Sequence, residues 1–334
     1  MTTAGALMAE EIADQPAVLS RLLRNGADGA AQARAAIARY RPRFVLLAAR
    51  GTSDHAALYA KYLAEVHLNL PAGLASPSTI TLYGARPDMS GVLFVAVSQS
   101  GGSPDLLQSL QEARNAGALT IAVTNAPDSS LARAAQHHVD IQAGPERSVA
   151  ATKTYTAQLL ALYLLLVGGD ASAVPDAAAR TLALADRAHA AARRFVDVDR
   201  LVTTARGFSY PTAREGALKL METSYLAAQA FSGADLLHGP LAMLGPDVPV
   251  IAVTTPGRGA AAMTAVLDRL TQAGVGVLHV GPSGTLPVVL DGVDEMLAPV
   301  VEILPLQQLA WRLALDRGSD PDRPRGLSKV TRTW

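Results

Sequence analysis

The chain has 334 residues, 49% of them hydrophobic and 17% charged, which is enough for two domains with sizeable cores. Its 29 basic residues balance its 29 acidic residues and form no basic block, which argues against nucleic acids and membrane surfaces as partners. It contains no cysteine, which excludes disulfides, thiolate metal sites and a cysteine nucleophile, and is compatible with the cytoplasm.

The start of the chain and its most apolar stretch argue against secretion and membrane insertion. Residues 1–15 include Glu10, Glu11 and Asp14 and lack the basic start and apolar core of a signal peptide. The longest apolar stretch, residues 159–167, is too short to span a bilayer and is typical of a buried helix. We therefore expect a soluble cytoplasmic protein with no membrane partner.

Helices and strands are predicted to alternate along the first half of the chain. Residues 5–40 are expected to form two helices, with breaks at Gln15-Pro16 and Asn25-Gly26, and a turn is expected at Pro77-Ser78. Strands are predicted at residues 43–49, 73–75, 92–97, 118–124 and 139–142, and helices at 51–67, 106–113 and 152–167. This alternation is typical of a doubly wound parallel sheet.

Polar residues are concentrated directly after the most apolar strand, where residues 98–105 have the sequence SQSGGSPD. Free N–H groups and the positive end of a helix dipole favour an anion at such a strand-to-helix loop, and glycine allows close approach. An ordinary helix start needs only one capping serine before Pro104. Because three serines and Gln99 exceed that need, a phosphate ester is the favoured ligand.

The second half of the chain repeats the first. Residues 44–53 align with residues 200–209, and residues 92–97 align with residues 248–253, both at an offset of 156. Ordered matches at one spacing indicate a tandem duplication. The counterpart of the serine-rich loop has the sequence TTPGRG, in which the serines are lost and proline removes a backbone donor. We therefore expect one phosphate site, in the first copy.

The expected fold class is α/β, with two doubly wound parallel sheets in tandem. Residues 1–170 would hold the N-terminal helices and the first unit, and residues 171–195 a linker whose helix runs from Pro175 to about Phe195. Residues 196–318 would form the second unit. Residues 319–334 would form a tail, whose Pro-, Arg- and Asp-rich composition is equally typical of a disordered end.

The second copy carries the densest group of ionisable residues. Glu215, Lys219 and Glu222 are spaced four and three apart, so they share one face of a predicted helix. Such a face is commonly solvated, with weak ion pairs; the alternative is a carboxylate base whose ionisation a neighbouring lysine tunes. Downstream, His238 lies at a glycine-rich turn, although a lone histidine is usually structural.

No metal or cofactor is predicted. The adjacent His137 and His138 cannot face one ligand site from a strand, and no metal-binding motif is present. A Walker loop and a dinucleotide-binding fingerprint are also absent, so the sequence indicates neither ATP nor NAD.

Taken in order, these motifs resemble the sugar isomerase (SIS) family, and specifically the tandem isomerase half of the glucosamine-6-phosphate synthases. The likeness covers nearly all of the chain and implies flavodoxin-like sheets. The residues that carry it are Glu11-Ile12, Gln15-Pro16, Arg50-Gly51-Thr52-Ser53, Ser98-Gln99-Ser100-Gly101, Val149-Ala150, Thr152-Lys153, Glu215-Gly216-Ala217-Leu218-Lys219-Leu220, His238-Gly239-Pro240-Leu241, Pro305-Leu306-Gln307, Leu327 and Lys329.

The resemblance implies a role for each matched polar residue. Glu222 would move a proton between C1 and C2 of an open-chain sugar phosphate, and Lys219 would support the charge of the enediol-like intermediate. His238 would assist ring opening across the interface of a homodimer, and Lys329 on the tail would close over the substrate and exclude water. The implied substrate-binding residues are Thr52, Ser53, Ser98, Gln99, Ser100, Ser103, Val149 and Ala151.

The sequence also departs from the synthases. They carry an amino-terminal glutaminase domain with a cysteine nucleophile, whereas this chain begins almost at once with the SIS unit and has no cysteine. Residues 102–104 replace an acidic residue and a threonine, and Ala151 replaces a serine that contacts the sugar. These differences resemble the stand-alone branch that converts glucosamine 6-phosphate to fructose 6-phosphate and ammonia, which is the activity we expect.

Two alternatives remain open. The first is an isomerase or deglycase for another phosphosugar, such as a galactosamine phosphate or an amine–sugar conjugate. The second is a non-catalytic phosphosugar sensor, which would have little reason to keep Glu222, Lys219, His238 and Lys329 together. A DNA-binding sensor would also need a basic helix-turn-helix, and the neutral sequence shows none.

Overall fold

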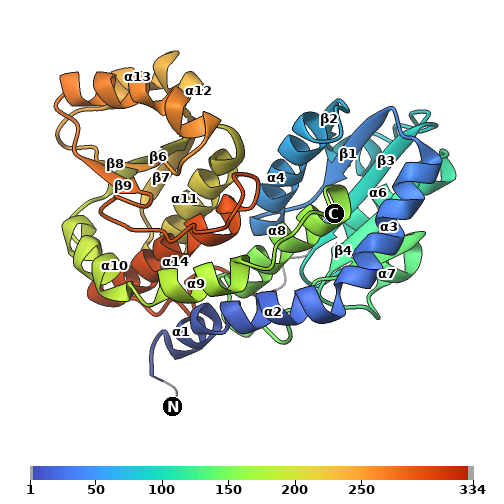
Figure 1. The fold of residues 1–334 in the computed structure, drawn as a ribbon, viewed down its shortest axis with the longest axis horizontal. Coiled ribbons are helices and arrows are strands. Elements are labelled where there is room, and N and C mark those ends of the chain that lie inside the picture. The colour runs from blue at the N-terminus through green and yellow to red at the C-terminus, as the bar shows by residue number, and fades with distance from the viewer. Residues whose placement is uncertain (1–2, 330–334) are drawn as a thin grey trace. The chain divides into compact units, whose positions relative to one another are not determined.

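The computed structural model describes residues 3–329, which form two compact units (Figure 1). We call them the first-sheet unit, residues 17–146 and 153–172, and the second-sheet unit, residues 3–16, 147–152 and 173–329. Each unit is thus assembled from separate segments of the chain. The four consecutive segments expected from the sequence stay a prediction about domains.

The first-sheet unit is built on five parallel strands: β1 (Phe44–Ala48), β2 (Ala72–Leu74), β3 (Val92–Ser98), β4 (Leu119–Thr124) and β5 (His137–Asp140). Their order in the sheet is β2-β1-β3-β4-β5, the doubly wound flavodoxin-like order. The expected fold class is confirmed. β3 is the apolar strand of the sequence, and six of its seven residues are buried, as a central parallel strand requires.

Seven helices are described in or entering this unit: α2 (Gln15–Asn25), α3 (Ala27–Tyr40), α4 (Thr52–Val66), α5 (Pro77–Thr81), α6 (Pro104–Asn115), α7 (Ser130–Ala134) and α8 (Lys153–Leu166). Every residue of α8 is buried, because it packs against α3, α4 and the strands β4 and β5. On the other face, Leu106 and Leu110 of α6 form a core with Phe94 and Ala96 of β3.

The second-sheet unit repeats this arrangement with β6 (Arg200–Ala205), β7 (Ala227–Ser232), β8 (Val250–Val253) and β9 (Val277–Val280). All pairs are parallel, and the order β7-β6-β8-β9 matches the order β2-β1-β3-β4 of the first sheet. β6 begins 156 residues after β1, the offset found in the sequence. The shared strand order supports the tandem duplication.

The helices of this unit are α1 (Ala6–Ala13), α9 (Val174–Leu182), α10 (Ala185–Ala192), α11 (Tyr210–Ser224), α12 (Gly233–Leu237), α13 (Arg258–Gln272) and α14 (Ala298–Asp316), with 3₁₀ turns η1 (Arg193–Phe195), η2 (Gly207–Ser209) and η3 (Pro240–Met243). The buried α14 packs against α1, α9, α10 and α11. No helix within residues 3–329 is long and apolar enough to cross a membrane.

Three details of the expected element order are wrong. Residues 5–40 form three helices rather than two: α1 ends at Ala13, α2 begins at Gln15 with Pro16 in its first turn, and Gly26 separates α2 from α3. The expected turn at Pro77-Ser78 is the first turn of α5, with proline at its start. The linker helix is two helices and a 3₁₀ turn, since α9 ends at Leu182 and the N–H of Leu184 bonds to the Thr181 carbonyl in the turn before α10.

Candidate functional site

The predicted phosphate residues lie at the switch point of the first sheet. β1 and β3 are neighbours although β2 separates them in sequence, and the loops after both strands begin at the same edge. Open α/β sheets bind ligands at the carboxyl ends of the strands, at this point of the order. Thr52 and Ser53 start α4 after β1, whereas Ser98 ends β3 and Ser103 precedes α6.

An ion pair ties the two loops together. Nη2 of Arg50 lies 2.8 Å from Oδ2 of Asp105, and Nε of Arg50 donates to the same oxygen at 2.9 Å. The other oxygen of Asp105 accepts the N–H of Leu106 at 2.9 Å, in the first turn of α6. The carboxylate is buried, so this pair fixes the spacing of the loops after β1 and β3. The sequence signal for this pair is an acidic residue in the first turn of α6.

Within the serine-rich loop, the backbone is shaped by its own hydroxyls. Oγ of Ser98 accepts the N–H of Gly101 at 3.1 Å, and Oγ of Ser100 accepts the N–H of Gly102 at 3.3 Å. Gly101 has φ of 60°, and a Cβ there would lie 2.2 Å from Oγ of Ser129, so only glycine fits. Ser103 stands at the N-cap of α6 but makes no side-chain cap bond within the described chain, so the ordinary capping interpretation does not explain it.

The remaining predicted phosphate residues differ in exposure. Ser53 is buried, and its Oγ accepts a hydrogen bond from Nε2 of Gln158 in α8 at 2.9 Å. Thr52 and Gln99 are half-buried at the rim of the two loops. The loops therefore offer neutral donors and the N-terminal end of α6, and Arg50, their nearby cation, is already paired.

The ionisable residues of α11 form a buried cluster. Nζ of Lys219 lies 3.2 Å from Oε1 of Glu215 and 2.6 Å from Oε2 of Glu222. The side chains of Lys219 and Glu215 are fully buried, whereas that of Glu222 is 21% exposed. The solvated-face interpretation is therefore wrong for this helix. Of the three groups, Glu222 is the one that solvent or a ligand can reach.

The two carboxylates keep the lysine charged. Burial by itself would lower the pKa of Lys219, but the charges of Glu215 and Glu222 and their hydrogen bonds outweigh it and raise the pKa above its ordinary value. The same ammonium lies 2.6 Å from Oε2 of Glu222 and so fixes that carboxyl group in place. A carboxyl group held beside a fixed cation and open on one side has the geometry of a general base.

His238 lies at the end of α12, where its ring is exposed. Nδ1 lies 2.8 Å from the carbonyl oxygen of Ala234, and because a carbonyl can only accept, Nδ1 carries the proton of this hydrogen bond. In the neutral ring, Nε2 is then the acceptor. Gly239 follows with φ of 119°, which L side chains rarely adopt, so the turn at His238 requires glycine.

The tail contacts the segment that contains Val149 and Ala151. Nζ of Lys329 donates to the carbonyl oxygen of Ser148 at 2.6 Å, and the N–H of Val149 donates to the Asp322 carbonyl at 3.4 Å. Both Val149 and Ala151 are half-buried. Up to residue 329 the tail is thus bonded to its own unit, and the structure brings Lys329 next to two predicted substrate residues.

Other groups hold the same segment from α1 and α14. The carboxylate of Glu11 accepts the N–H groups of Arg147 and Ser148, and Nε2 of Gln307 donates to the Thr152 carbonyl at 3.3 Å. Further along the tail, the guanidinium of Arg325 lies 4.2 Å from the ring of Tyr225, which closes α11. The matched motifs at residues 11 and 307 therefore support the backbone of the 147–152 segment.

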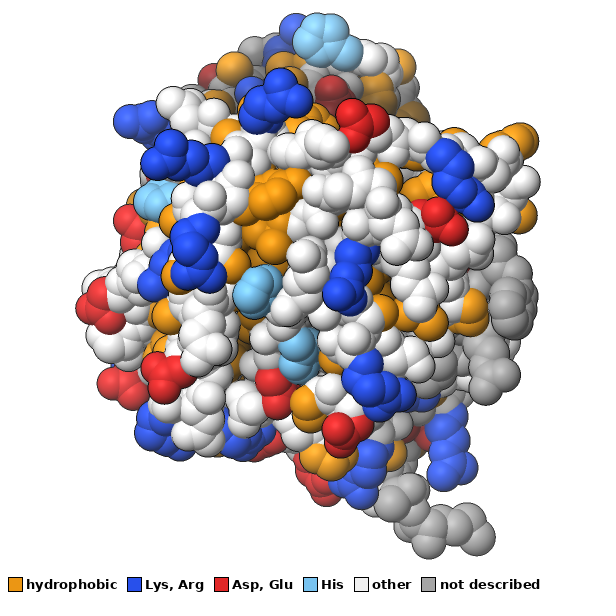
Figure 2. Space-filling model, turned by 90° about the vertical axis from the view of Figure 1, so that its right-hand side faces the viewer, with side chains coloured by type: hydrophobic (Ala, Val, Ile, Leu, Met, Phe, Trp, Pro, Cys, Tyr) orange, Lys and Arg blue, Asp and Glu red, His pale blue; other side chains and the backbone are white. Residues whose placement is uncertain are grey.

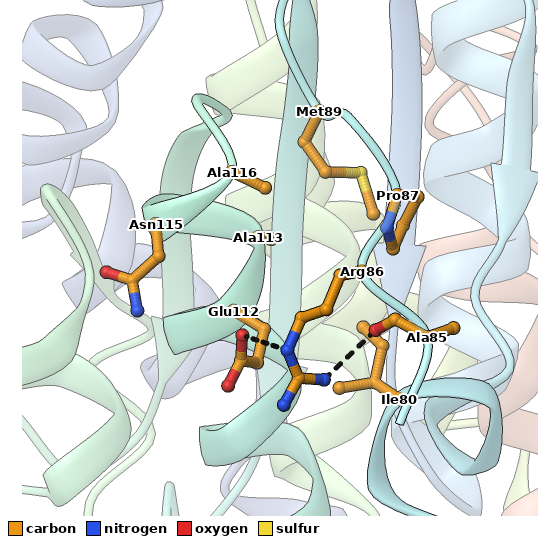
Figure 3. A pocket seen from close by; sticks show the side chains of 9 residues that line it. All are labelled: Ile80, Ala85, Arg86, Pro87, Met89, Glu112, Ala113, Asn115 and Ala116. Atoms are coloured by element: carbon orange, nitrogen blue, oxygen red, sulfur yellow. Dashed lines mark hydrogen bonds and ion pairs between the residues drawn. The ribbon is translucent and has the colours of Figure 1, made fainter. Parts of the chain in front are cut away.

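A cavity of about 230 Å³ lies elsewhere in the first-sheet unit (Figure 3). It is mainly apolar, with Met89 and Ile80 in its wall, and the ion pair between Arg86 and Glu112 borders it at 3.2 Å. None of the predicted site residues lines it. Figure 2 shows one face of the molecule, on which basic and acidic side chains alternate without a large area of one sign.

Comparison with known proteins decides the family. The SIS domain family matches residues 40–168 and 194–281, which together make up more than half of the chain. The chain belongs to the SIS domain family. The match comes in two segments, each of which contains one of the two parallel sheets.

Several relatives of this SIS protein are isomerizing glutamine–fructose-6-phosphate aminotransferases. The one from Methanothermobacter thermautotrophicus is 36% identical over 301 residues, covering 85% of this chain and 51% of the relative. The chain thus spans about half the length of the curated relatives it matches. The C-terminal domain of the Francisella tularensis glucosamine-fructose-6-phosphate aminotransferase superposes with a TM-score of 0.83 and 29% identity, covering 95% of this chain and 98% of that one.

The fold is also shared with a deaminase. Glucosamine-6-phosphate deaminase from Thermotoga maritima superposes with a TM-score of 0.81 at 21% identity, covering 98% of this SIS chain and 100% of that one. At this identity the likeness establishes the tandem fold alone. The resemblance inferred from the motifs, to the isomerase half of the synthases, is confirmed by the aminotransferase relatives.

Proposed function

We propose that this SIS protein is a phosphosugar isomerase that acts on an amino sugar 6-phosphate, with glucosamine 6-phosphate as the preferred substrate. The observation that carries the proposal is the buried Lys219, placed between Glu215 and Glu222, with only Glu222 accessible. Burying an ammonium and a carboxylate is costly, and a surface ion pair would meet any structural need more cheaply. A carboxyl base that a substrate can reach and that a buried cation holds in place accounts for the arrangement.

The reaction balances with water as the only second reactant. Glu222 removes the proton from C2 of the open-chain aldehyde and returns it to C1, while one proton of the C2 amine passes to the C1 oxygen. The products of this step are a hydroxyl group at C1 and a ketimine at C2. Water hydrolyses the ketimine to the ketone of fructose 6-phosphate, and the amine leaves as ammonia. Lys219 stabilises the negative charge that develops on the enediol-like intermediate, while Glu215 keeps Lys219 protonated.

Three further groups are assigned to steps around the proton transfer. Nε2 of His238 exchanges the proton that opens the sugar ring, and the exposure of the ring suits action across a dimer interface. Lys329 covers the substrate from the tail, which is already bonded to the 147–152 segment. The loops after β1 and β3 bind the phosphate through hydroxyls and backbone N–H groups.

The direction of the reaction is proposed from two differences from the synthases. Ala151 lacks the hydroxyl that the synthases place at this position, and residues 102–104 lack their acidic residue and threonine. Both differences resemble the stand-alone deaminating branch of the family, and the direction is proposed from that resemblance. The deaminase fold neighbour supports this direction only through its architecture.

The deciding experiment offers the purified protein a panel of hexosamine 6-phosphates and measures ammonia and ketose phosphate in the same samples. We expect glucosamine 6-phosphate to give both products in equal amounts, and added glutamine to yield no amino sugar. If another sugar phosphate gives ketose phosphate without ammonia, that sugar phosphate replaces glucosamine 6-phosphate as the proposed substrate. Tight binding of a sugar phosphate with no product would show a sensor instead of an enzyme.

A further inference from the structure

The second sheet has a switch point of its own, equivalent to the phosphate site of the first sheet. It lies between β6 and β8, which are neighbours although β7 separates them in sequence. The loop after β6 leads through η2 into α11, and the loop after β8 leads into α13. In the first sheet the same two loops carry the predicted phosphate residues.

A carboxylate of the chain itself fills this second position. Glu302, on α14, is fully buried. Its Oε1 accepts a hydrogen bond from Oγ of Ser209 at 2.8 Å and one from the hydroxyl of Thr255, and its Oε2 accepts one from the hydroxyl of Thr212 at 2.9 Å. The donors come from the loop after β6, the first turn of α11 and the loop after β8.

A second carboxylate occupies the start of α13. Oε1 of Glu295 accepts the N–H of Gly259 at 3.2 Å, in the first turn of that helix. A Cβ on Gly257 would lie 2.2 Å from the carboxyl carbon of Glu295, so the side chain fills the space that this loop leaves open. The carboxyl groups of Glu302 and Glu295 thus accept hydrogen bonds at the second switch point. In the first sheet the equivalent donors are left for the proposed phosphate ligand.

Stability alone does not account for Glu302. Burial raises its pKa above the ordinary value, the hydrogen bonds from Thr255, Ser209 and Thr212 oppose that shift, and the charge of Glu295 adds to it. A raised pKa means that the folded protein disfavours the ionised form relative to the unfolded chain. Apolar side chains of similar size would avoid that cost.

We propose that Glu302 is a positioning residue: its carboxylate takes, at the second switch point, the place of a bound anion and fixes the start of the helix that carries Lys219 and Glu222. Thr212 joins Glu302 to α11 two residues after that helix begins. Glu222 lies ten positions further along the same helix, about 15 Å at the rise of an α-helix. Since the helix is rigid, a change at its start is transmitted to Glu222.

The inference rests on the proposed function only in assigning catalysis to α11, so its test has a part that needs no activity. Glu302→Ala is compared with Glu295→Gln and wild type by hydrogen exchange of the amides of residues 210–216. Sodium formate and sodium chloride are added at equal ionic strength, because formate can replace the missing carboxylate. We expect roughly tenfold faster exchange in Glu302→Ala, reversed by formate and not by chloride.

The catalytic part measures kcat and KM for glucosamine 6-phosphate in the same samples. We expect Glu302→Ala to lower kcat about tenfold with KM changed less than twofold, and formate to restore kcat. If Glu302→Ala does not fold, Glu302→Gln keeps the shape without the charge, and faster exchange than in Glu295→Gln supports the proposal. Equal exchange in these two variants, or rescue by chloride as strong as by formate, overturns it. An inactive wild type overturns the proposed function and leaves the exchange result valid.

Discussion

Lys219 and Glu222 form an ion pair of 2.6 Å in which the lysine is fully buried and the glutamate is open on one side. The ammonium holds the carboxyl group of Glu222 in place, and the open side is where a substrate proton can be taken. We expect Glu222→Gln to keep KM for glucosamine 6-phosphate and to lower kcat by roughly 10²–10⁴. Steady-state kinetics check this. Glu112→Gln, at the partly exposed pair with Arg86, is the matched control. If Glu222→Gln retained turnover, Glu222 would not be the base that moves the proton.

Replacing Lys219 alone should lower the free energy of unfolding more than replacing Lys219 and Glu215 together. Lys219→Met leaves the buried carboxylate of Glu215 beside an uncharged side chain, at a cost of about 3–5 kcal/mol in the free energy of unfolding. The double variant Lys219→Met/Glu215→Gln should recover most of that loss, because the fully buried carboxylate is gone and the remaining one, Glu222, is 21% exposed. Chemical denaturation of both variants measures the difference. A double variant as unstable as the single one would show that packing, not charge, is responsible.

Phosphate recognition should depend on the first sheet only. We expect Ser100→Ala and Ser103→Ala each to raise KM by roughly 10- to 150-fold, the equivalent of about 1.5–3 kcal/mol for a lost bond to a charged group. Ser98→Ala should do the same, and it also removes the bond to Gly101. Thr254→Ala, at the corresponding loop after β8, should change KM little. Equal effects at Ser100 and Thr254 would contradict a single phosphate site.

The assignment of His238 to a partner subunit predicts complementation. Neither Glu222→Gln nor His238→Ala should be active alone. A mixture that exchanges subunits should regain up to about half of the activity per mixed dimer, because one of its two sites would hold both native residues. Activity is assayed after mixed dimers have been demonstrated by mass spectrometry of differently tagged chains. Mixed dimers without activity would place His238 at the site of its own chain.

The pKa of Glu302 predicts how stability depends on pH. Because the folded-state pKa lies above the ordinary value of 4.5, this group stabilises the fold fully below about pH 4.5. That contribution is lost as the pH rises through the folded pKa. We therefore expect wild type to lose stability relative to Glu302→Gln as the pH rises above 4.5, measured by denaturation at a series of pH values. A constant difference between the two proteins would mean that the pKa of Glu302 is not shifted.

Much of this architecture follows from short-range patterns. The apolar run of β3, the polar loop behind it and the 156-residue offset predict two parallel sheets and one phosphate loop, because strand pairing and helix starts depend on neighbouring residues. The spacing of Glu215, Lys219 and Glu222 predicts their common face. It does not predict burial, since burial depends on α14, which lies far along the chain and packs over α11.

The contacts that were missed all join distant segments. Asp105 pairs with Arg50 across 55 positions, and Glu302 meets Ser209 and Thr212 across 93 and 90. No local pattern distinguishes such a carboxylate from an ordinary surface residue before the fold brings its partners to it. The break between α9 and α10 was missed for another reason: no glycine or proline marks Ala183-Leu184.

The bonds between α1 and the tail affect the order in which the protein can fold during synthesis. The carboxylate of Asp322 accepts the N–H groups of Leu7 and Met8, and that of Asp320 accepts the N–H of Gly5. The first-sheet unit is complete once residue 172 has left the ribosome. The second-sheet unit needs residues from both ends, so the bonds of α1 to Asp320 and Asp322 must wait until about 150 more residues have been translated, roughly 8–30 s at usual elongation rates.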